Sequence, residues 1–305
     1  MKLAVVFPSV IYREGPPGVK KLIEGIESIG FDELDMFDHV VMGHPTKTRP
    51  SPIYPPTMPI LEAFSLLSFA AAITKRICLA TSVLVLPQRQ PALVAKQVGT
   101  LDILSGGRLK LGVGSGWQRS EYEALDEDFA SRGSRLEEAI DLLRSYWREE
   151  HVVFEGKHYQ ADDIAMEPKP LQGSKLPIWI GGTKDVALKR IARIADGWMA
   201  MSAPGDSPLK ERIATLHRFA LEANRDPAQI GLQMMLAPDT RDREERKRFF
   251  VDTDLMRARL NTLQELGFGH VSIDCVPIFQ AGHRSSDAIL EHLQKIHTAL
   301  SQDIS

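Results

Sequence analysis

Short runs of β-branched and aliphatic residues alternate with longer amphipathic segments along almost the whole chain. The short runs predict strands at residues 3–7, 33–37, 77–86, 108–113, 177–180, 197–201, 231–236 and 270–275. Helical periodicity between the strands predicts helices at residues 19–29, 60–73, 92–104, 132–149, 185–194, 208–223, 254–266 and 287–300. The strand candidates are apolar almost throughout, so we expect a parallel sheet that is covered by helices.

Eight strand–helix units are the number that a closed barrel needs. The sequence therefore predicts one α/β domain over residues 1–305, with the fold of a (β/α)8 TIM barrel. An open, doubly wound sheet is the competing arrangement. Residues 117–175 are too many for a single connecting helix, and we interpret them as an insertion after strand 4 on the active-site face. Within this interval, residues 152–159 are typical of a hairpin with Gly156 in its turn.

Two connecting segments have an unusual composition. Residues 43–59 follow the second predicted strand and contain six prolines, so they form either a stiff wall of a pocket or a plain surface connection. Residues 239–248 are almost wholly charged, which favours a solvated, mobile segment over a functional lid.

The overall composition is that of a globular protein, with 43% hydrophobic and 25% charged residues in a chain of 305. A formal net charge of -3 gives no electrostatic reason to expect nucleic acid or an anionic membrane as a partner. Cys78 and Cys275 lie far apart and form no C-x-x-C motif, which argues against a disulfide framework or a zinc knuckle. The first apolar run ends at Pro8 and is typical of a buried strand rather than a signal peptide. We expect a cytoplasmic protein.

Active sites of barrels lie where strands end, and the second predicted strand ends at Asp38 and His39. A carboxylate beside an imidazole can bind a hydroxylated ring and move a proton. A capping aspartate beside a surface histidine is the alternative. His44 is the only second histidine nearby and no carboxylate completes a ligand set, so we expect no metal site.

Glycine-rich turns follow the fourth and fifth predicted strands. Residues 112–116 carry glycine at every second position, which lets the backbone approach a ligand closely, although packing alone also explains them. Trp117 stands where a dinucleotide fingerprint needs glycine. Gly181 and Gly182 immediately precede a predicted helix, a suitable seat for a phosphate. The turn at residues 196–197 is either a tight turn or a cofactor contact, and no Gly-x-Ser-x-Gly elbow is present.

Taken together, these segments resemble the bacterial-luciferase-like superfamily, and more closely its branch that uses the deazaflavin coenzyme F420. The resemblance runs from the first strand to about Met201 and is most specific at residues 97–117, 177–182 and 191–198. It implies that Asp38 binds the cofactor ring and that His39 faces its reactive carbon. It also implies a non-prolyl cis peptide at Ser82-Val83 that backs the ring. Further cofactor contacts are expected at Val85, Ser115, Gly116, Gly181, Gly182, Asp196 and Gly197.

The sequence departs from this branch at one informative residue. Sugar-phosphate dehydrogenases of the branch carry a catalytic glutamate directly after the glycine turn, where this chain has Trp117. The loop from Met201 to Pro204 offers no basic residue for a sugar phosphate. The resemblance therefore favours an apolar or aromatic substrate.

The leading hypothesis is an oxidoreductase that transfers a hydride between F420 and a small organic substrate, with His39 as the catalytic residue. The alternative within the superfamily is a two-component monooxygenase that uses reduced FMN from a partner flavin reductase. A non-catalytic barrel that stores or senses the cofactor is the third hypothesis. The resemblance also implies a homodimer.

Overall fold

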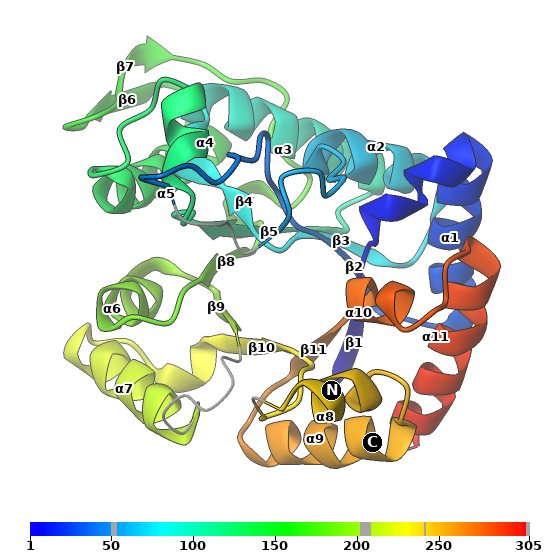
Figure 1. Ribbon diagram of the computed structural model, residues 1–305. Helices are drawn as coiled ribbons and strands as arrows, with labels where there is room; N and C mark the ends of the chain where they lie inside the picture. Colours follow the sequence, from blue (N-terminus) through cyan, green and yellow to red (C-terminus); the bar gives the residue numbers. More distant parts are fainter. Residues whose placement is uncertain (50–53, 202–208, 241, 303–305) are drawn as a thin grey trace.

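Parallel strands close into a barrel with helices around it in the computed structural model, which describes residues 1–49, 54–201, 209–240 and 242–302 (Figure 1). The strands are β1 (Lys2–Val6), β2 (Glu33–Met36), β3 (Cys78–Thr81), β4 (Leu84–Val85), β5 (Leu109–Gly114), β6 (Val152–Glu155), β7 (Gln160–Ile164), β8 (Ile178–Gly181), β9 (Gly197–Ala200), β10 (Gly231–Met235) and β11 (His270–Asp274). The helices are α1 (Gly15–Ile29), α2 (Ala63–Ile73), α3 (Pro91–Ser105), α4 (Arg119–Ala124), α5 (Arg132–Arg148), α6 (Asp185–Ile194), α7 (Leu209–Glu222), α8 (Arg243–Phe249), α9 (Thr253–Glu265), α10 (Cys275–Gln280) and α11 (Ser286–Ser301).

The main sheet runs in the order β3-β2-β1-β11-β10-β9-β8-β5-β4, and a further pairing of β3 with β5 closes it. Its ladders are parallel throughout, as the βαβ connections require. Eight strands form the closed wall, and β4 is a two-residue addition beside β5. The prediction of a TIM barrel is therefore confirmed, and the open sheet is excluded.

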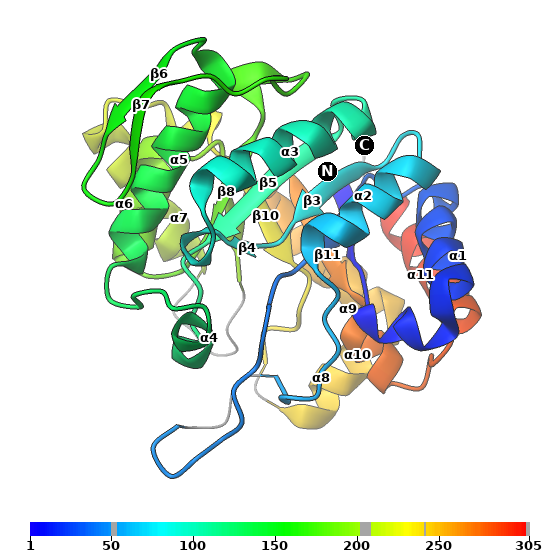
Figure 2. The same ribbon diagram turned by 90° about the horizontal axis from the view of Figure 1, so that it is seen from above.

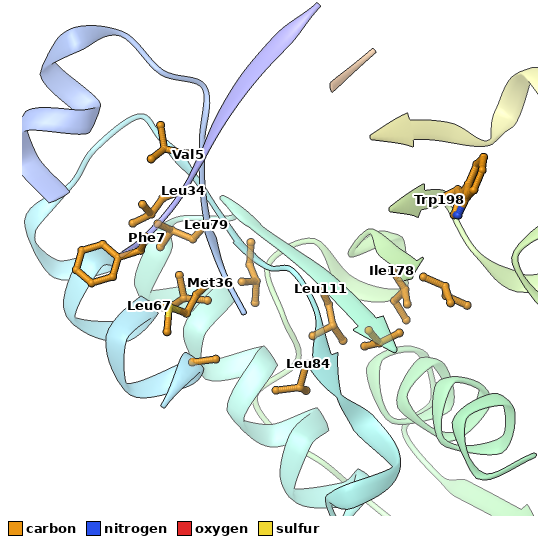
Figure 3. Close-up of a cluster of buried hydrophobic side chains, with 14 of the residues drawn as sticks. Val5, Phe7, Leu34, Met36, Leu67, Leu79, Leu84, Leu111, Ile178 and Trp198 are labelled. Atoms are coloured by element: carbon orange, nitrogen blue, oxygen red, sulfur yellow. The ribbon is translucent and has the colours of Figure 1, made fainter. Parts of the chain in front are cut away.

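The main apolar core lies between the barrel and its helices. Alternate residues of neighbouring strands, such as Leu34, Leu79 and Leu111, point outward and gather with Leu67 of α2 (Figure 3). These side chains are fully buried. Because a strand side chain alternates between the two faces of the sheet, the residues between them point into the barrel.

The interior of the barrel carries a buried polar cluster below the mouth. Lys110 Nζ donates to Glu33 Oε1 at 2.5 Å and to Gln233 Oε1 at 2.7 Å, and Ser272 Oγ donates to Asp35 Oδ2 at 2.6 Å. Burial raises the pKa of Asp35 well above its usual range, and the neighbouring Glu33 raises it further. Burial also acts to raise the pKa of Glu33, but the charge of Lys110 and the hydrogen bonds with Asp35 and Lys110 together outweigh burial and lower it. The cluster thus places hydrogen-bonded polar and charged groups inside the barrel.

The helices begin and end where their local chemistry allows. The side chain of Glu62 accepts hydrogen bonds from the amides of Phe64 and Ser65 and so caps α2. Pro91 opens α3, and Gly106, with a φ of 69°, ends it in the left-handed conformation that favours glycine. The predicted helices and strands therefore recur with shifts of only a few residues at their ends.

One local strand prediction was wrong, and some short helices were not predicted. The run at residues 77–86 is not one strand, because the chain breaks between β3 and β4 at Ser82-Val83. The charged segment at residues 239–248 contains the short helix α8, which Asp242 caps through the amides of Glu244 and Glu245, and its solvated, mobile character stays a prediction. A cavity of about 490 Å³ opens between α8 and α9. The helices α4 and α10 were not predicted, because six-residue helices show too little periodicity.

The long interval after β5 holds a covering helix and two additions. Helix α5 packs on α3 and takes the place of the helix between β5 and β8. The predicted hairpin exists as β6 and β7, outside α5 (Figure 2). Glu138 of α5 holds its turn by accepting hydrogen bonds from the amides of Lys157, His158 and Tyr159.

Some sequence predictions concern residues outside the described part of the chain. These are residues 50–53 of the proline-rich loop, Ser202 to Pro204 of the loop after β9, the first residue of the helix predicted at 208–223, and Arg241 of the charged segment. Within the described ranges, no helix is long and apolar enough to cross a membrane, and no group of three or more His, Cys, Asp or Glu side chains is arranged to hold a metal ion.

Candidate active site

His39 lies just beyond the carboxyl end of β2 and is joined to a buried carboxylate. Its Nδ1 is 3.0 Å from Oε2 of Glu121, a residue of α4. The side chains are 7% and 1% exposed, respectively. The short helix α4 follows the glycine turn after β5, so the pair joins the β2 and β5 units of the barrel, which are separated by β3. The alternative in which His39 is a surface histidine is therefore excluded.

Hydrogen bonds fix the charge state of Glu121. Burial raises the pKa of this carboxyl, but hydrogen bonds from His39, Gln88 and the amide of Val40 outweigh burial and lower it. An ionised carboxylate only accepts hydrogen bonds. Nδ1 of His39 therefore carries the hydrogen of this contact, and Nε2 is the ring nitrogen left for a ligand.

Aromatic rings surround the imidazole of His39. The ring centroid of Trp117 lies 5.4 Å from that of His39, and the ring of Tyr54 lies 6.0 Å away. Phe37 stacks on Tyr54 at 6.1 Å, and Trp117 is 40% exposed. The surroundings of His39 are therefore suited to a flat or apolar molecule.

Asp38 fastens the end of β2 to the segment that follows β3. Its Oδ2 accepts from the amide of Val85 at 3.1 Å, and its Oδ1 accepts from Arg89 Nη2 at 2.7 Å. The carboxylate is 2% exposed. Burial raises the pKa of Asp38, and the charge of Arg89 opposes that rise. These bonds give Asp38 a structural role, while its expected contact with a cofactor ring stays a prediction.

The Ser82-Val83 peptide is cis, as the resemblance implies. Glycines line the side chain of Val83: a Cβ added at Gly114 would lie 2.7 Å from Val83 Cγ2, and one at Gly181 would lie 3.3 Å from Val83 Cγ1. The structure thus brings residues of β5 and β8 against one valine at the mouth of the barrel. These contacts bear out the packing role of the glycines, while the close approach of a ligand to their backbone stays a prediction.

Ser115 and Gly116 continue this surface. Gly116 has a φ of 64°, which favours glycine, and an added Cβ would lie 2.6 Å from Val85 Cγ1. The carbonyl of Ser115 accepts from the hydroxyl of Tyr122 at 2.7 Å, which holds the turn against α4. Val85 is thus packed between the Asp38 carboxylate and the glycine turn.

Gly181 and Gly182 end β8 just before α6. Gly182 has a φ of 153°, and its carbonyl accepts from the indole of Trp198 at 2.7 Å. No side chain caps the first turn of α6, whose N-cap residue is Lys184. Free amides at a helix N-terminus attract anions, so this end of α6 fits the phosphate seat that the sequence predicts.

Asp196 and Gly197 require a correction. They precede β9, so they lie at its amino-terminal end, away from the strand ends that hold the other candidates. Asp196 Oδ2 accepts from Arg144 Nη2 at 2.9 Å and from the amide of Ile178 at 2.7 Å, and Gly197 gives room to the ring of Trp179. Both residues have structural partners there, and we withdraw them as cofactor contacts.

Two residues of the site were not predicted. Glu121 lies in a helix that the periodicity does not reveal, and no motif marks it. Asp274 is the last residue of β11, and the rule that barrel sites lie at strand ends was sufficient to select it. Burial raises the pKa of Asp274 to about 6.

The family model of luciferase-like monooxygenases matches residues 1–270. The chain belongs to the luciferase-like monooxygenase family. An uncharacterised protein of Mycobacterium tuberculosis is 40% identical over 167 residues, which are 55% of this chain and 57% of that protein. The match thus spans little more than half the length of that relative.

Other known proteins are similar to this chain over a greater length. The F420-dependent glucose-6-phosphate dehydrogenase of Nakamurella multipartita is 31% identical over 306 residues, covering 94% of this chain and 84% of that protein. A solved structure, the oxygenating constituent of 3,6-diketocamphane monooxygenase from Pseudomonas putida in complex with FMN, has a TM-score of 0.69 at 17% identity. That match covers 97% of this chain and 98% of the other.

Proposed function

We propose that the protein is an oxidoreductase that transfers a hydride between coenzyme F420 and a small, apolar or aromatic substrate. The observation that carries the proposal is the His39–Glu121 pair, with Nε2 left for a ligand and aromatic rings around the imidazole. The F420-dependent relative supports the choice of cofactor, because its similarity extends over 94% of this chain. The expected homodimer and cytoplasmic location stay predictions.

The residues at the mouth fit a flavin-type cofactor. Val83, whose side chain packs closely against Gly114 and Gly181 at the strand ends, would support one face of the ring system. The amides at the uncapped start of α6, beside Lys184, would hold the cofactor's phosphate. The bound deazaflavin would supply a centre that accepts or donates a hydride.

A side chain of the protein would accept or return the proton of the substrate hydroxyl. When a substrate alcohol loses a hydride from carbon, its oxygen must also lose a proton, and the reverse reaction must return one. Nε2 of His39 is the group that we assign to this exchange, because Nδ1 is engaged by Glu121. Glu121 acts on His39 by fixing its tautomer and orientation, so it is a positioning residue.

A side-by-side titration with F420 and with FMN, followed by fluorescence, tests the cofactor assignment. We expect saturable binding of F420. Tight binding of FMN without binding of F420 would overturn the proposal and favour a two-component monooxygenase with a reductase partner. That second function is favoured by the likeness to the FMN-bound structure, which shows a common fold only.

Variants of His39 test the catalytic assignment. With a panel of secondary alcohols and ketones, His39→Gln is expected to lower kcat by about 10²–10⁴-fold while cofactor affinity changes little, because general acid–base catalysis contributes about that factor. His44→Gln is the matched control, since His44 is exposed on the following loop. If His39→Gln binds F420 and turns over as the wild type does, a non-catalytic role gains support.

A further inference from the structure

Asp274 points into the mouth of the barrel. On β11, Ser272 places its hydroxyl inside the barrel, where it donates to Asp35. Side chains of a strand alternate, so the residue two places further along faces the same interior. Asp274 is also paired in register with Val6, the last residue of β1. Its carboxyl therefore belongs to the interior layer nearest the strand ends, above the Ser272–Asp35 contact.

Asp274 faces the same space as the aromatic rings around His39. The pKa of Tyr54 is raised by burial and then by the negative charge of Asp274, so the Asp274 carboxylate lies within electrostatic range of the Tyr54 side chain. Tyr54 in turn lies 6.0 Å from His39 and 6.5 Å from Trp117 between ring centroids. A molecule held by these rings lies within the electrostatic reach of Asp274.

Within the described ranges, one oxygen of the Asp274 carboxyl forms a hydrogen bond and the other does not. Its Oδ1 accepts from the amide of Val276 at 2.9 Å and so caps α10. Among the residues that the structure describes, no cation is paired with it. The other oxygen, Oδ2, has no hydrogen-bond partner within that part of the chain and is not among the fully buried atoms.

The barrel places Asp274 opposite the Val83 surface. Around the closed sheet, β11 is separated from β3 and β4 by β1 and β2 on one side, and from β5 by β8, β9 and β10 on the other. A cofactor ring supported by Val83 would therefore leave a space between the ring and Asp274. His39, at the end of β2, borders that space.

We propose that Asp274 determines substrate specificity: its free oxygen binds a hydroxyl of an uncharged substrate, and its charge excludes substrates that carry a carboxylate or phosphate. The inference rests on the proposed function, because it assigns the space facing Val83 to the substrate. Two like charges in a poorly solvated mouth repel each other more strongly than in water. An alcohol, in contrast, can donate to an ionised carboxylate.

The proposal can be tested by measuring ligand binding, without a turnover assay. Trp147, Trp179 and Trp198 are at most 7% exposed whereas Trp117 is 40% exposed, so quenching of tryptophan fluorescence reports on Trp117. The probes are benzyl alcohol and benzoate, which share a ring and differ in charge, added to the full-length protein with saturating F420 at about pH 8, above the pKa of Asp274 of about 6. If F420 does not bind, the titrations are made on the protein alone.

In the wild type we expect benzyl alcohol to bind at least about ten times more tightly than benzoate, the factor that corresponds to a modest like-charge repulsion. Asp274→Asn should bring the ratio to within about threefold while benzyl alcohol still binds, which also shows that the variant is folded. Asp252→Asn, at another helix-capping aspartate, should leave the ratio unchanged.

Equal affinities in the wild type, or an unchanged ratio in Asp274→Asn, would refute the assignment, as would a failure of benzyl alcohol to quench Trp117. These outcomes differ from a failure of the proposed function. Absence of F420 binding together with a ratio that depends on Asp274 would leave the specificity role intact and reject the cofactor.

Discussion

Replacing Asp274 by Asn is expected to stabilise the protein at neutral pH. Burial raises the pKa of this carboxyl to about 6 from the ordinary value of 3.8. Between these two values the folded state binds more protons than the unfolded state, so the free energy of unfolding falls as pH rises. Above about pH 6 the full cost of an ionised, half-buried carboxylate is present. An uncharged amide does not carry that cost.

The magnitude follows from the size of the pKa shift. A difference of about two pK units, at about 1.4 kcal/mol per unit, gives an upper value of about 3 kcal/mol. The side chain retains some contact with solvent, so screening reduces the cost, and we expect a gain of about 1–3 kcal/mol at pH 7. Asn caps a helix about as well as Asp does, so the contact with the amide of Val276 is retained.

Urea unfolding of the wild type and of Asp274→Asn, measured at intervals from about pH 4 to pH 8, tests this reasoning. The difference in the free energy of unfolding should be near zero at pH 4 and should grow until about pH 7. Asp252→Asn is the control, and this variant should be less stable than the wild type at neutral pH. The reason is that hydrogen bonds from the amide of Leu255 and from Arg248 lower the pKa of Asp252 and so favour its ionised form in the folded state. A difference that is absent, or that does not grow with pH, would contradict the assigned burial of Asp274.

Two further predictions concern packing and buried charge. Gly114→Ala should destabilise the protein by about 1–3 kcal/mol in thermal unfolding, because the new methyl group would lie 2.7 Å from Val83 Cγ2. In the double variant with Val83→Ala, most of this loss of stability should be recovered. If it is not recovered, the contact between the two residues is refuted. Glu33→Gln should lower the free energy of unfolding in urea by about 3–5 kcal/mol, because it leaves the buried charge of Lys110 without its partner. Glu222 forms an exposed ion pair with Arg218, and Glu222→Gln should lower the free energy of unfolding by less than about 1 kcal/mol. Equal effects of these two substitutions would show that burial does not matter at Glu33.

The barrel was predictable from the sequence because its signals are local and repeated. Most strands are rich in apolar residues and most long helices show an apolar stripe, so the number and order of the units predict the fold. The break at Ser82-Val83 was different. Nothing in the composition of residues 77–86 interrupts a strand, and only the resemblance to the family indicated a cis peptide there.

The candidate site was predictable only in part, because its contacts join residues that are distant in the sequence. His39 and Asp38 were selected as strand-end residues, but their partners, Glu121 and Arg89, are 82 and 51 residues away, respectively. Periodicity carries no information on such pairs. Asp196 was misplaced for a related reason: a glycine turn before a strand resembles one after a strand, although the two lie at opposite ends of the barrel.

Three carboxylates lie at the mouth of the barrel, those of Asp38, Glu121 and Asp274, and they differ in how far they stabilise the fold. Asp38 is paired with Arg89 and fastens the segment that carries Val83, and Glu121 is bound to His39 and to backbone amides. Asp274 accepts one amide hydrogen bond, which an asparagine or a serine would accept equally well. A carboxylate at this residue therefore lowers the stability of the fold at neutral pH without a structural gain that depends on its charge. Residues that lower stability in this way are expected where a ligand uses the charge, which is the argument for Asp274 as part of the substrate site.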